Sequence, residues 1–235
     1  MKIGIIGAMN EEIERMKTEM EIVETHIFAT VTFYEGKMNG QDLILCKCGV
    51  GKVNAALTSQ ILIDKFTISH LLFTGVAGAV DDSLDVGDLV ISTSAMQHDL
   101  DVTPLGFKKG EIPYFNGSSD FQADETLIQM AVQAAKALPD RRIVQGRIVS
   151  GDQFIADHKY VQSLREEFTA ACVEMEGAAV AQVAAMNDVP FVIIRSMSDK
   201  ANGEASVNFQ EFTVLASEQS HLLVSNIVRT LKGTL

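Results

Sequence analysis

The apolar run Val189-Pro190-Phe191-Val192-Ile193-Ile194 continues directly into Arg195-Ser196-Met197-Ser198-Asp199. An apolar run without polar alternation is typical of a strand whose two faces are both buried. Arg195 and Asp199 then lie at the end of that strand, where burying an unpaired charge is expensive. Ligands of α/β proteins bind at the carboxyl ends of the strands. The stretch therefore predicts an α/β fold with a ligand site at one edge of its sheet.

A second apolar segment carries acidic residues in a similar way. Glu174 and Glu176 lie between the apolar stretches 170–173 and 178–181. Each acid also has a purely structural interpretation, since Glu176 at a helix start stabilises the helix dipole and Asp199 can cap the turn after it. Arg195, as a buried arginine, is expected to need a carboxylate close by as its partner.

Strand and helix patterns alternate along the rest of the chain. We predict strands at 2–8, 27–38, 41–48, 70–74, 88–100, 143–149 and 189–196, and helices at about 10–20, 52–65, 124–137, 157–167, after 176, and 208–231. Asn10 is the predicted N-cap of the first helix, and Asn39-Gly40 turns an antiparallel hairpin. The glycines in 75–78 indicate a turn. Because the hairpin is antiparallel, the predicted sheet is mixed.

Composition favours one domain and a small-molecule partner. The chain has 235 residues, 47% of them hydrophobic, with a mean hydropathy of +0.15. This is enough for one large core, so we expect a single α/β domain spanning residues 1–235. The net charge of -12 and the pI of about 4.8 repel nucleic-acid phosphates and anionic lipid, so neither nucleic acid nor a membrane is an expected partner.

The amino-terminal segment and the cysteines indicate a cytoplasmic protein. The apolar start runs directly into the acidic residues of 11–14, which does not fit a signal peptide, and no apolar run reaches the roughly 18 residues that would span a bilayer. Cys46 and Cys48 lie on one face of a predicted strand and Cys172 is remote, so we expect reduced, buried thiols. A metal at Cys46 and Cys48 would lack further ligands at a useful spacing.

The segment 102–120 has no regular pattern and contains Pro104, Gly106, Gly110, Pro113 and Gly117. A loop of this length inside a compact domain usually has a function. We expect a lid or a contact between subunits.

Two glycine motifs resemble nucleotide-binding loops but lack the required spacing. Gly49-Val50-Gly51-Lys52 has no glycine five residues before Gly51, and Val53 replaces the hydroxyl residue that binds magnesium in a P-loop. Gly4-Ile5-Ile6-Gly7 lacks the Gly-x-Gly-x-x-Gly pattern of a dinucleotide site. We therefore expect no nucleotide cofactor.

Glu12 and Phe154 have ordinary interpretations when each is taken alone. Glu12 is one of several acids in the first turn of a predicted helix, where acids complement the helix dipole. Phe154 is an aromatic residue beside Ile155 and is typical of a core position. The five histidines are scattered, and only His98 is near a strand end, so structural roles are favoured for them.

The order and spacing of eight short motifs is more specific than any one of them. Together they resemble the 5'-methylthioadenosine/S-adenosylhomocysteine nucleosidases of the purine nucleoside phosphorylase superfamily, over nearly the whole chain. This family implies a single-domain, three-layer α/β/α fold with a central mixed sheet, and neither cofactor nor metal. The motifs are Gly-Ala-Met-x-Glu-Glu (7–12), Gly-Val-Gly-Lys-Val-Asn-Ala-Ala (49–56), Thr-Gly-Val-Ala-Gly (74–78), Val-Gly-Asp (86–88), His-Asp-Leu-Asp-Val-Thr (98–103), Ser-Gly-Asp-Gln-Phe-Ile (150–155), Val-Glu-Met-Glu (173–176) and Arg-Ser-Met-Ser-Asp (195–199).

The resemblance implies hydrolysis of the N-glycosidic bond of 5'-methylthioadenosine, S-adenosylhomocysteine and 5'-deoxyadenosine. Asp199 is then the general acid that protonates adenine N7, with its pKa raised by an apolar environment and with Ser198 and Arg195 holding it in place. Glu12 is the ionised general base that activates water. Glu176 binds the ribose hydroxyls and favours the cationic transition state.

The same resemblance assigns the remaining contacts of the nucleoside. Met175 is expected on the sugar, Phe154 on adenine, the Ile155 backbone at the edge of the base and the Gly78 backbone beside the nucleoside. The implied lining for the 5'-thioalkyl group consists of Met9, Val50, Val102 and Phe209. Residues of the long segment are expected to complete the pocket of the neighbouring subunit, which implies a homodimer: Leu105, Phe107 and Pro113.

One departure and three alternatives accompany this interpretation. Val76 stands where some family members have serine, which puts one hydroxyl contact near the base in doubt. A futalosine-type hydrolase would share the acid, the base and the ribose contact. A phosphorylase is disfavoured because Glu12 would repel each negative charge of a phosphate by about 4 kcal/mol at ~4 Å and an effective dielectric constant near 20. A non-catalytic nucleoside-binding module would have no use for both Glu12 and Asp199.

Overall fold

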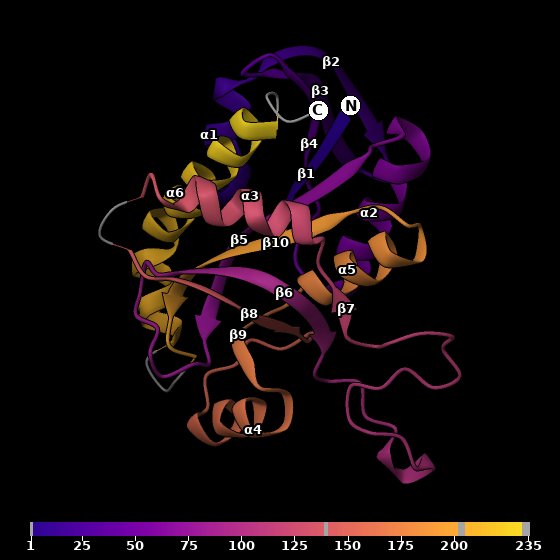
Figure 1. Cartoon of the computed structure of the whole chain (residues 1–235), viewed down its shortest axis with the longest axis vertical. Coiled ribbons are helices and arrows are strands. Elements are labelled where there is room, and N and C mark those ends of the chain that lie inside the picture. The colour runs from indigo at the N-terminus through magenta and orange to yellow at the C-terminus, as the bar shows by residue number, and fades with distance from the viewer. Residues whose placement is uncertain (1, 139–140, 202–204, 232–235) are drawn as a thin grey trace.

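A computed structural model describes residues 2–138, 141–201 and 205–231 (Figure 1). For residues 205–208 and 210 it describes the backbone only. Its strands are β1 (Lys2–Gly7), β2 (Glu21–Phe28), β3 (Val31–Met38), β4 (Gln41–Lys47), β5 (His70–Ala79), β6 (Leu89–Gln97), β7 (Phe121–Gln122), β8 (Ile143–Ser150), β9 (Ala170–Glu174) and β10 (Phe191–Asp199). Its helices are α1 (Asn10–Glu19), α2 (Lys52–Phe66), the 3₁₀ turn η1 (Thr103–Leu105), α3 (Glu125–Ala135), α4 (His158–Phe168), α5 (Gly177–Met186) and α6 (Ala205–Leu231).

The strands form one mixed sheet in the order β10-β6-β8-β9-β5-β1-β4-β3-β2, with β7 paired to β6. Strand β1 runs parallel to both β4 and β5, whereas β9 is antiparallel to β5 and β6 is antiparallel to β10. Because β10 also pairs with β5, five strands close into a ring at one end of the sheet. The predicted mixed sheet is confirmed, and its closed end brings the carboxyl ends of β5 and β10 together.

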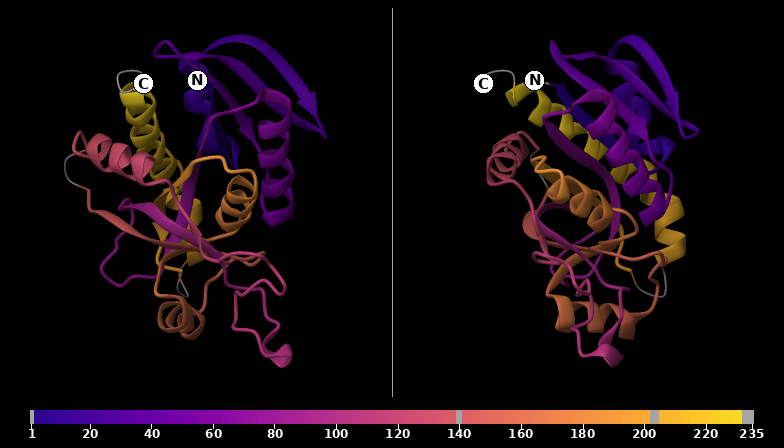
Figure 2. Two further views of the ribbon diagram at one scale, coloured as in Figure 1. Left: turned by 45° about the vertical axis from the view of Figure 1, so that its right-hand side comes forward. Right: turned by 90° about the vertical axis from the view of Figure 1, so that its right-hand side faces the viewer.

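The two faces of the sheet have separate hydrophobic cores, as the alternation of side chains along a strand requires. In β1, Ile3 and Ile5 pack into a cluster with α1, α3 and α6, while Ile6 packs into a cluster with α2 and α5. Figure 1 shows α3 and α6 on one side of the strands and α2 and α5 on the other, and Figure 2 shows the same layers from two further directions. The three-layer α/β/α fold is confirmed.

The sequence prediction lacks the short strand β7, strand β9 and β2 as a separate strand. Residues 21–28 form β2, and the chain reverses at Ala29 and Thr30, which both have positive φ, before β3 begins at Val31. A single strand over 27–38 was therefore the wrong prediction. An Ala-Thr pair is not a typical turn sequence, so the local pattern gave no signal for this hairpin.

The glycines of 75–78 are part of strand β5 and do not form a turn, which corrects the prediction. Ser196 and Met197 of β10 pair with Val76 and Ala77 in parallel register. A Cβ atom on Gly75 would lie 2.5 Å from Glu12 Oε1, and one on Gly78 would lie 2.9 Å from Asp199 Oδ1. The glycines therefore allow two carboxyl groups to approach the strand backbone closely.

The N-cap of α1 is Met9, and Asn10 is the first helical residue, so the predicted cap is displaced by one position. The Glu12 side chain accepts a hydrogen bond from the Met9 amide at 2.9 Å, which is half of a capping box. Glu12 thus belongs to the helix start as well as to the site described below.

The cysteines and helices of the described ranges add two observations. Cys46, Cys48 and Cys172 are buried and are not paired with one another. None of the helices in the described part of the chain combines the length and apolarity needed to cross a membrane.

Candidate active site

A cavity of 270 Å³ opens where β1, β5 and β10 end, beside the segments that follow β4, β8 and β9. Segments that are far apart in the sequence contribute to it, as expected for a site at the carboxyl ends of strands. Its lining consists of Ala8, Met9, Glu12, Val50, Val76, Ala77, Gly78, Gln153, Phe154, Ile155, Val173, Glu174, Met175, Glu176, Ser198, Asp199 and Phe209.

Most of the residues singled out in the sequence lie on this cavity. They are Glu12, Asp199, Gly78, Phe154, Ile155, Met175, Glu176, Ser198, Met9, Val50 and Phe209. Arg195 and Val102 do not line it, and neither do Leu105, Phe107 and Pro113. Val102 is a correction to the expected lining of its own chain: it directly precedes η1, in the long segment that projects from the body at the lower right of Figure 1.

Glu12 is a buried carboxyl group that three backbone amides hold in place. Oε2 accepts from the Ala8 and Met9 amides at 2.5 and 2.9 Å, and Oε1 accepts from the Val76 amide at 3.1 Å. Burial raises the pKa of Glu12 above its usual value, while the charge of Arg195 and the three amides oppose that rise. The group is thus oriented in the cavity and has a raised affinity for a proton.

Asp199 lies at the end of β10, where it is 2% exposed. Its Oδ1 accepts from the Ala201 amide at 2.7 Å, and its Oδ2 accepts from the Ser198 hydroxyl at 2.8 Å. Burial raises the pKa of Asp199, and these two hydrogen bonds only partly oppose it. Ser198 therefore holds Asp199 as the resemblance implied.

Arg195 does not hold Asp199, which corrects the second part of that expectation. Its guanidinium forms an ion pair with Glu174 and stacks on the Phe73 ring, with 3.9 Å from Cζ to the ring centroid. Although burial opposes its charge, the carboxylates of Glu174, Glu12 and Glu176 raise the pKa of Arg195. The need of a buried arginine for a carboxylate partner is confirmed, and the partner is Glu174.

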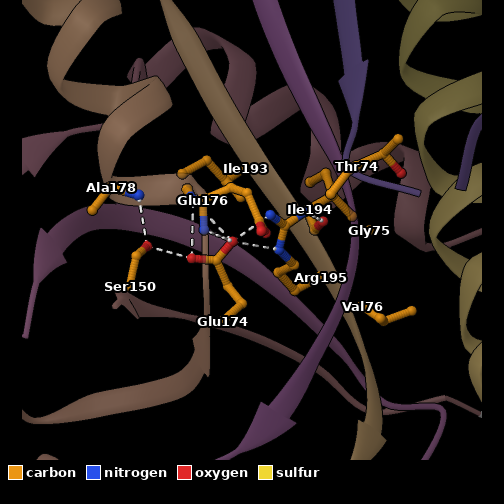
Figure 3. A network of polar contacts seen from close by, with 12 residues as sticks. Thr74, Gly75, Val76, Ser150, Glu174, Glu176, Ala178, Ile193, Ile194 and Arg195 are labelled. Carbon is orange, nitrogen blue, oxygen red and sulfur yellow. Dashed lines mark hydrogen bonds and ion pairs between the residues drawn. The ribbon is translucent and has the colours of Figure 1, made fainter. Parts of the chain in front are cut away.

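Glu174 lies in this site, although the sequence alone assigned it no role. It accepts hydrogen bonds from the Ser150 hydroxyl, from the Gly177 amide at 2.8 and 2.9 Å, and from Arg195 (Figure 3). Ser150 in turn accepts from the Ala178 amide at 2.7 Å. Glu174 therefore fixes the start of α5, the end of β8 and the arginine together, and its position one residue after a buried apolar run was the available signal.

Glu176 points back across the cavity to the segment after β4. Its Oε1 accepts from the Gly51 amide at 2.7 Å. Burial, with the nearby charge of Glu174 as the next cause, raises the pKa of Glu176 to about 8. A neutral carboxyl group can donate one hydrogen bond and accept others, which suits a contact with a pair of hydroxyl groups.

The rest of the cavity is apolar and aromatic. The Phe154 ring is 49% exposed and meets the Phe209 ring edge to face, with the centroids 5.6 Å apart. Met9, Val50 and Met175 add apolar surface. The described residues that line the cavity include no lysine, arginine or histidine.

This arrangement suits one kind of chemistry. Two separately held carboxyl groups, Glu12 and Asp199, face a cavity with an exposed ring at its side and a third carboxyl group, Glu176, between apolar walls. A pair of carboxyl groups can protonate a leaving group and activate a water molecule in glycosidic bond cleavage. An exposed aromatic ring suits a stacked base.

Comparison with known proteins places the chain in a class and in a family. The model of the phosphorylase superfamily matches residues 2–229. A 5'-methylthioadenosine/S-adenosylhomocysteine nucleosidase of Geobacillus sp. (strain WCH70) is 43% identical over 233 residues, which are 99% of this chain and 100% of the relative. The chain belongs to the 5'-methylthioadenosine/S-adenosylhomocysteine nucleosidase family of that superfamily.

Two solved structures have the same fold as this chain. The Neisseria meningitidis 5'-methylthioadenosine/S-adenosylhomocysteine nucleosidase, in complex with methylthio-immucillin-A, superposes with a TM-score of 0.94 at 38% identity and covers 97% of this chain and 99% of its own. A futalosine hydrolase of Helicobacter pylori has a TM-score of 0.92 at 32% identity and covers 97% of both chains.

Proposed function

We propose that this enzyme hydrolyses the N-glycosidic bond of 5'-methylthioadenosine and S-adenosylhomocysteine, and also of 5'-deoxyadenosine, with water as the nucleophile. The observation that carries the proposal is one cavity that holds Glu12 and Asp199 in different environments. The products are adenine and the 5'-substituted ribose. The 43% identity to the 5'-methylthioadenosine/S-adenosylhomocysteine nucleosidase of Geobacillus sp., over the full length of that relative, supports this substrate class.

Asp199 is proposed as the general acid. It must carry a proton near neutral pH so that adenine N7 receives it as the glycosidic bond breaks. Burial raises its pKa, and no charged group is among the causes that oppose the rise. The carboxyl group therefore has the environment of an acid that stays protonated.

Glu12 is proposed as the general base. The Arg195 charge and three amide donors favour its ionised form and counteract the effect of burial on its pKa. Asp199 has only one amide and one hydroxyl donor. Burial raises the pKa of both groups, but only Glu12 has a nearby positive charge, that of Arg195, which favours the ionised form that a general base requires.

Glu176 and the aromatic residues are proposed to bind the nucleoside. Glu176 contacts the ribose hydroxyls, and a positive charge that develops on the sugar lowers its pKa and draws it toward the ionised, stabilising form. Phe154 stacks on adenine, the Ile155 backbone bonds the edge of the base, and the backbone of Gly78 lies beside the nucleoside. Arg195 acts through Glu174 and does not touch the substrate.

Water is favoured over phosphate as the nucleophile. A phosphate dianion beside an ionised Glu12 at ~4 Å would be repelled by about 8 kcal/mol at an effective dielectric constant near 20, twice the value for a single charge. The described lining residues provide no cationic side chain to offset it. A second candidate is hydrolysis of futalosine-type nucleosides, which the similarity to the Helicobacter pylori futalosine hydrolase favours.

A homodimer is part of the proposal. Leu105 and Tyr114 of the segment between β6 and β7 are 69% and 89% exposed, and Val53 on α2 is 78% exposed. Exposed apolar side chains on a projecting segment suit a second subunit. We propose that Leu105, Phe107 and Pro113 reach the cavity of the neighbouring subunit.

We also propose that the enzyme works in the cytoplasm, in methionine salvage.

Release of free adenine in phosphate-free buffer tests the proposed function. We expect turnover of 5'-methylthioadenosine and S-adenosylhomocysteine that does not change when phosphate is added. Turnover that requires phosphate would assign a phosphorylase, and a preference for futalosine over both adenine nucleosides would assign the second candidate. Binding of these nucleosides without any base release would assign a non-catalytic module.

A further inference from the structure

A polar network outside the cavity joins three segments that are far apart in the sequence. The Lys52 ammonium donates to Asp99 Oδ1 at 2.6 Å and to Gln97 Oε1 at 2.9 Å. The other oxygen of Asp99 accepts from the Asp152 amide at 2.9 Å. Asp152 Oδ1 accepts from the Lys52 amide at 2.8 Å. Lys52, Asp99 and Asp152 thus form a closed ring of contacts, here called the Lys52 ring.

The Lys52 ring meets the cavity at the amino-terminal end of α2. Two consecutive amides at this end bind carboxylates from different elements: Gly51 donates to Glu176 at 2.7 Å and Lys52 donates to Asp152 at 2.8 Å. A helix leaves its first amides without partners inside the helix, so these two contacts satisfy them. Asp152 therefore holds the peptide group next to the one that binds Glu176.

Chain continuity extends the effect of the Lys52 ring to both sides of the cavity. Val50 lies two residues before Lys52, and Phe154 lies two residues after Asp152; both line the cavity. Asp99 stands at the beginning of the segment that projects between β6 and β7. The three charged residues thus connect the wall around Val50, the ring of Phe154 and the base of the projecting segment.

The Lys52–Asp99 ion pair of the ring is partly shielded from solvent, whereas Asp152 is exposed. The side chains of Lys52 and Asp99 are 18% and 16% exposed. Burial of Asp99 opposes its ionisation, but the Lys52 and Asp152 hydrogen bonds prevail and lower its pKa. Charge-assisted hydrogen bonds of this kind are stronger than neutral ones, and their loss leaves a partly buried group without a partner.

We propose that Asp99, Lys52 and Asp152 are positioning residues that set the distance between Val50, Phe154 and Glu176 for the bound nucleoside. None of the three lines the cavity. The inference rests on the proposed function, because the nucleoside is the ligand whose binding the Lys52 ring supports. Its effect is on affinity more than on chemistry, since Glu12 and Asp199 have no contact with the ring.

A double-mutant cycle on Lys52 and Asp99 tests the inference. We expect D99N and K52M each to raise KM for 5'-methylthioadenosine about tenfold, the size of one lost charge-assisted hydrogen bond, with kcat within about threefold of wild type. The double variant K52M/D99N should be no worse than the poorer single variant, since both changes break one contact. D152A, which removes the acceptor of the Lys52 amide, should raise KM by a similar factor.

The control is E35Q. Lys2 and Glu35 form a lysine–carboxylate pair of similar geometry, with 2.7 Å between Nζ and Oε1, and Glu35 does not line the cavity. We expect its KM and kcat to equal those of wild type. Titration of adenine into each folded variant gives a second measurement that needs no turnover, and D99N and D152A should weaken adenine binding about tenfold.

The outcomes separate the inference from the function on which it rests. Wild-type KM and adenine affinity in D99N and D152A, or multiplying effects in the double variant, would overturn the positioning role while leaving the nucleosidase in place. A wild-type enzyme that neither hydrolyses 5'-methylthioadenosine nor binds adenine would overturn both. A fall in melting temperature with unchanged KM and adenine affinity would make the ring purely structural and would also overturn the inference.

Discussion

Replacement of Glu12 by glutamine changes one side chain at the point where the proposed base and the fold depend on the same contacts. The carboxylate accepts from the amides of Ala8, Met9 and Val76. A glutamine has one acceptor oxygen, so when it satisfies Ala8 and Met9 its NH₂ group faces the Val76 amide. One buried donor is then left without an acceptor, which costs about 1–3 kcal/mol.

Two effects of opposite sign set the net stability of this variant. The substitution removes a carboxylate whose charge is disfavoured by burial, and this change stabilises the folded state. It also removes a negative charge near the buried Arg195, and this change destabilises the folded state. We expect a net loss of about 1 kcal/mol, or roughly 2–4 °C in melting temperature for a chain of this size. The loss of a general base should lower kcat by about 10²–10⁴.

Calorimetry and adenine release measured on the same samples check this prediction. The matched control is Glu11→Gln, the same change at an exposed position in the same helical turn, and it should behave as wild type. A Glu12→Gln enzyme that melts within a few degrees of wild type and keeps kcat within tenfold would refute the assignment of Glu12 as the base.

Three further perturbations have definite expected outcomes. Because the folded state raises the pKa of Asp199, this group stabilises the fold at pH values below its unfolded pKa of 3.8, and the contribution is lost as pH rises through the folded pKa. Asp199→Asn should therefore melt higher than wild type at pH 8 with the advantage shrinking toward pH 4; a constant difference across this range would contradict the raised pKa. Gly78→Ala places a Cβ 2.9 Å from Asp199 Oδ1, and the resulting shift of the acid should lower kcat at least about tenfold, measured against 5'-methylthioadenosine. Glu174→Gln leaves Arg195 buried without its charge partner and should cost about 3–5 kcal/mol by denaturant unfolding, part of which a second change, Arg195→Met, restores; no restoration would mean that the ion pair is not the main contribution of Glu174.

The sequence was most informative where apolar periodicity was strong. The run 189–194 was enough to predict the α/β fold and a ligand site at strand ends, and the hairpin at Asn39-Gly40 was enough to predict a mixed sheet. Strand β2 was missed because its residues are mostly exposed and its turn, Ala29 and Thr30, uses positive φ without glycine or asparagine. A local sequence pattern does not predict a strand that is stabilised by pairing with the neighbouring strand of its hairpin.

The candidate site was predictable in its members and less so in their partners. Glu176 and Asp199 were singled out as acids beside apolar segments, whereas Glu12 was identified only by the family resemblance. The partner of Arg195 could not be read from the chain, because Glu174 and Glu176 are equally near in sequence and only the end of β9 decides which one faces the arginine. The glycines of 75–78 predict a turn because glycine is locally unfavourable inside a strand. They are explained by the close approach of two carboxyl groups, which depends on the tertiary structure and not on the local sequence.

The central claim is that Asp199 gives a proton to the departing base while Glu12 activates water, and a change of leaving group tests it most directly. Turnover of 5'-methylthioadenosine should be compared with turnover of nitrophenyl 5-methylthioriboside, whose nitrophenolate leaving group departs without a proton, in Asp199→Asn and Glu12→Gln. The account predicts that Asp199→Asn loses about 10²–10⁴ in kcat on the nucleoside and stays near wild type on the nitrophenyl riboside, whereas Glu12→Gln is impaired on both. Equal impairment of Asp199→Asn on the two substrates would contradict it.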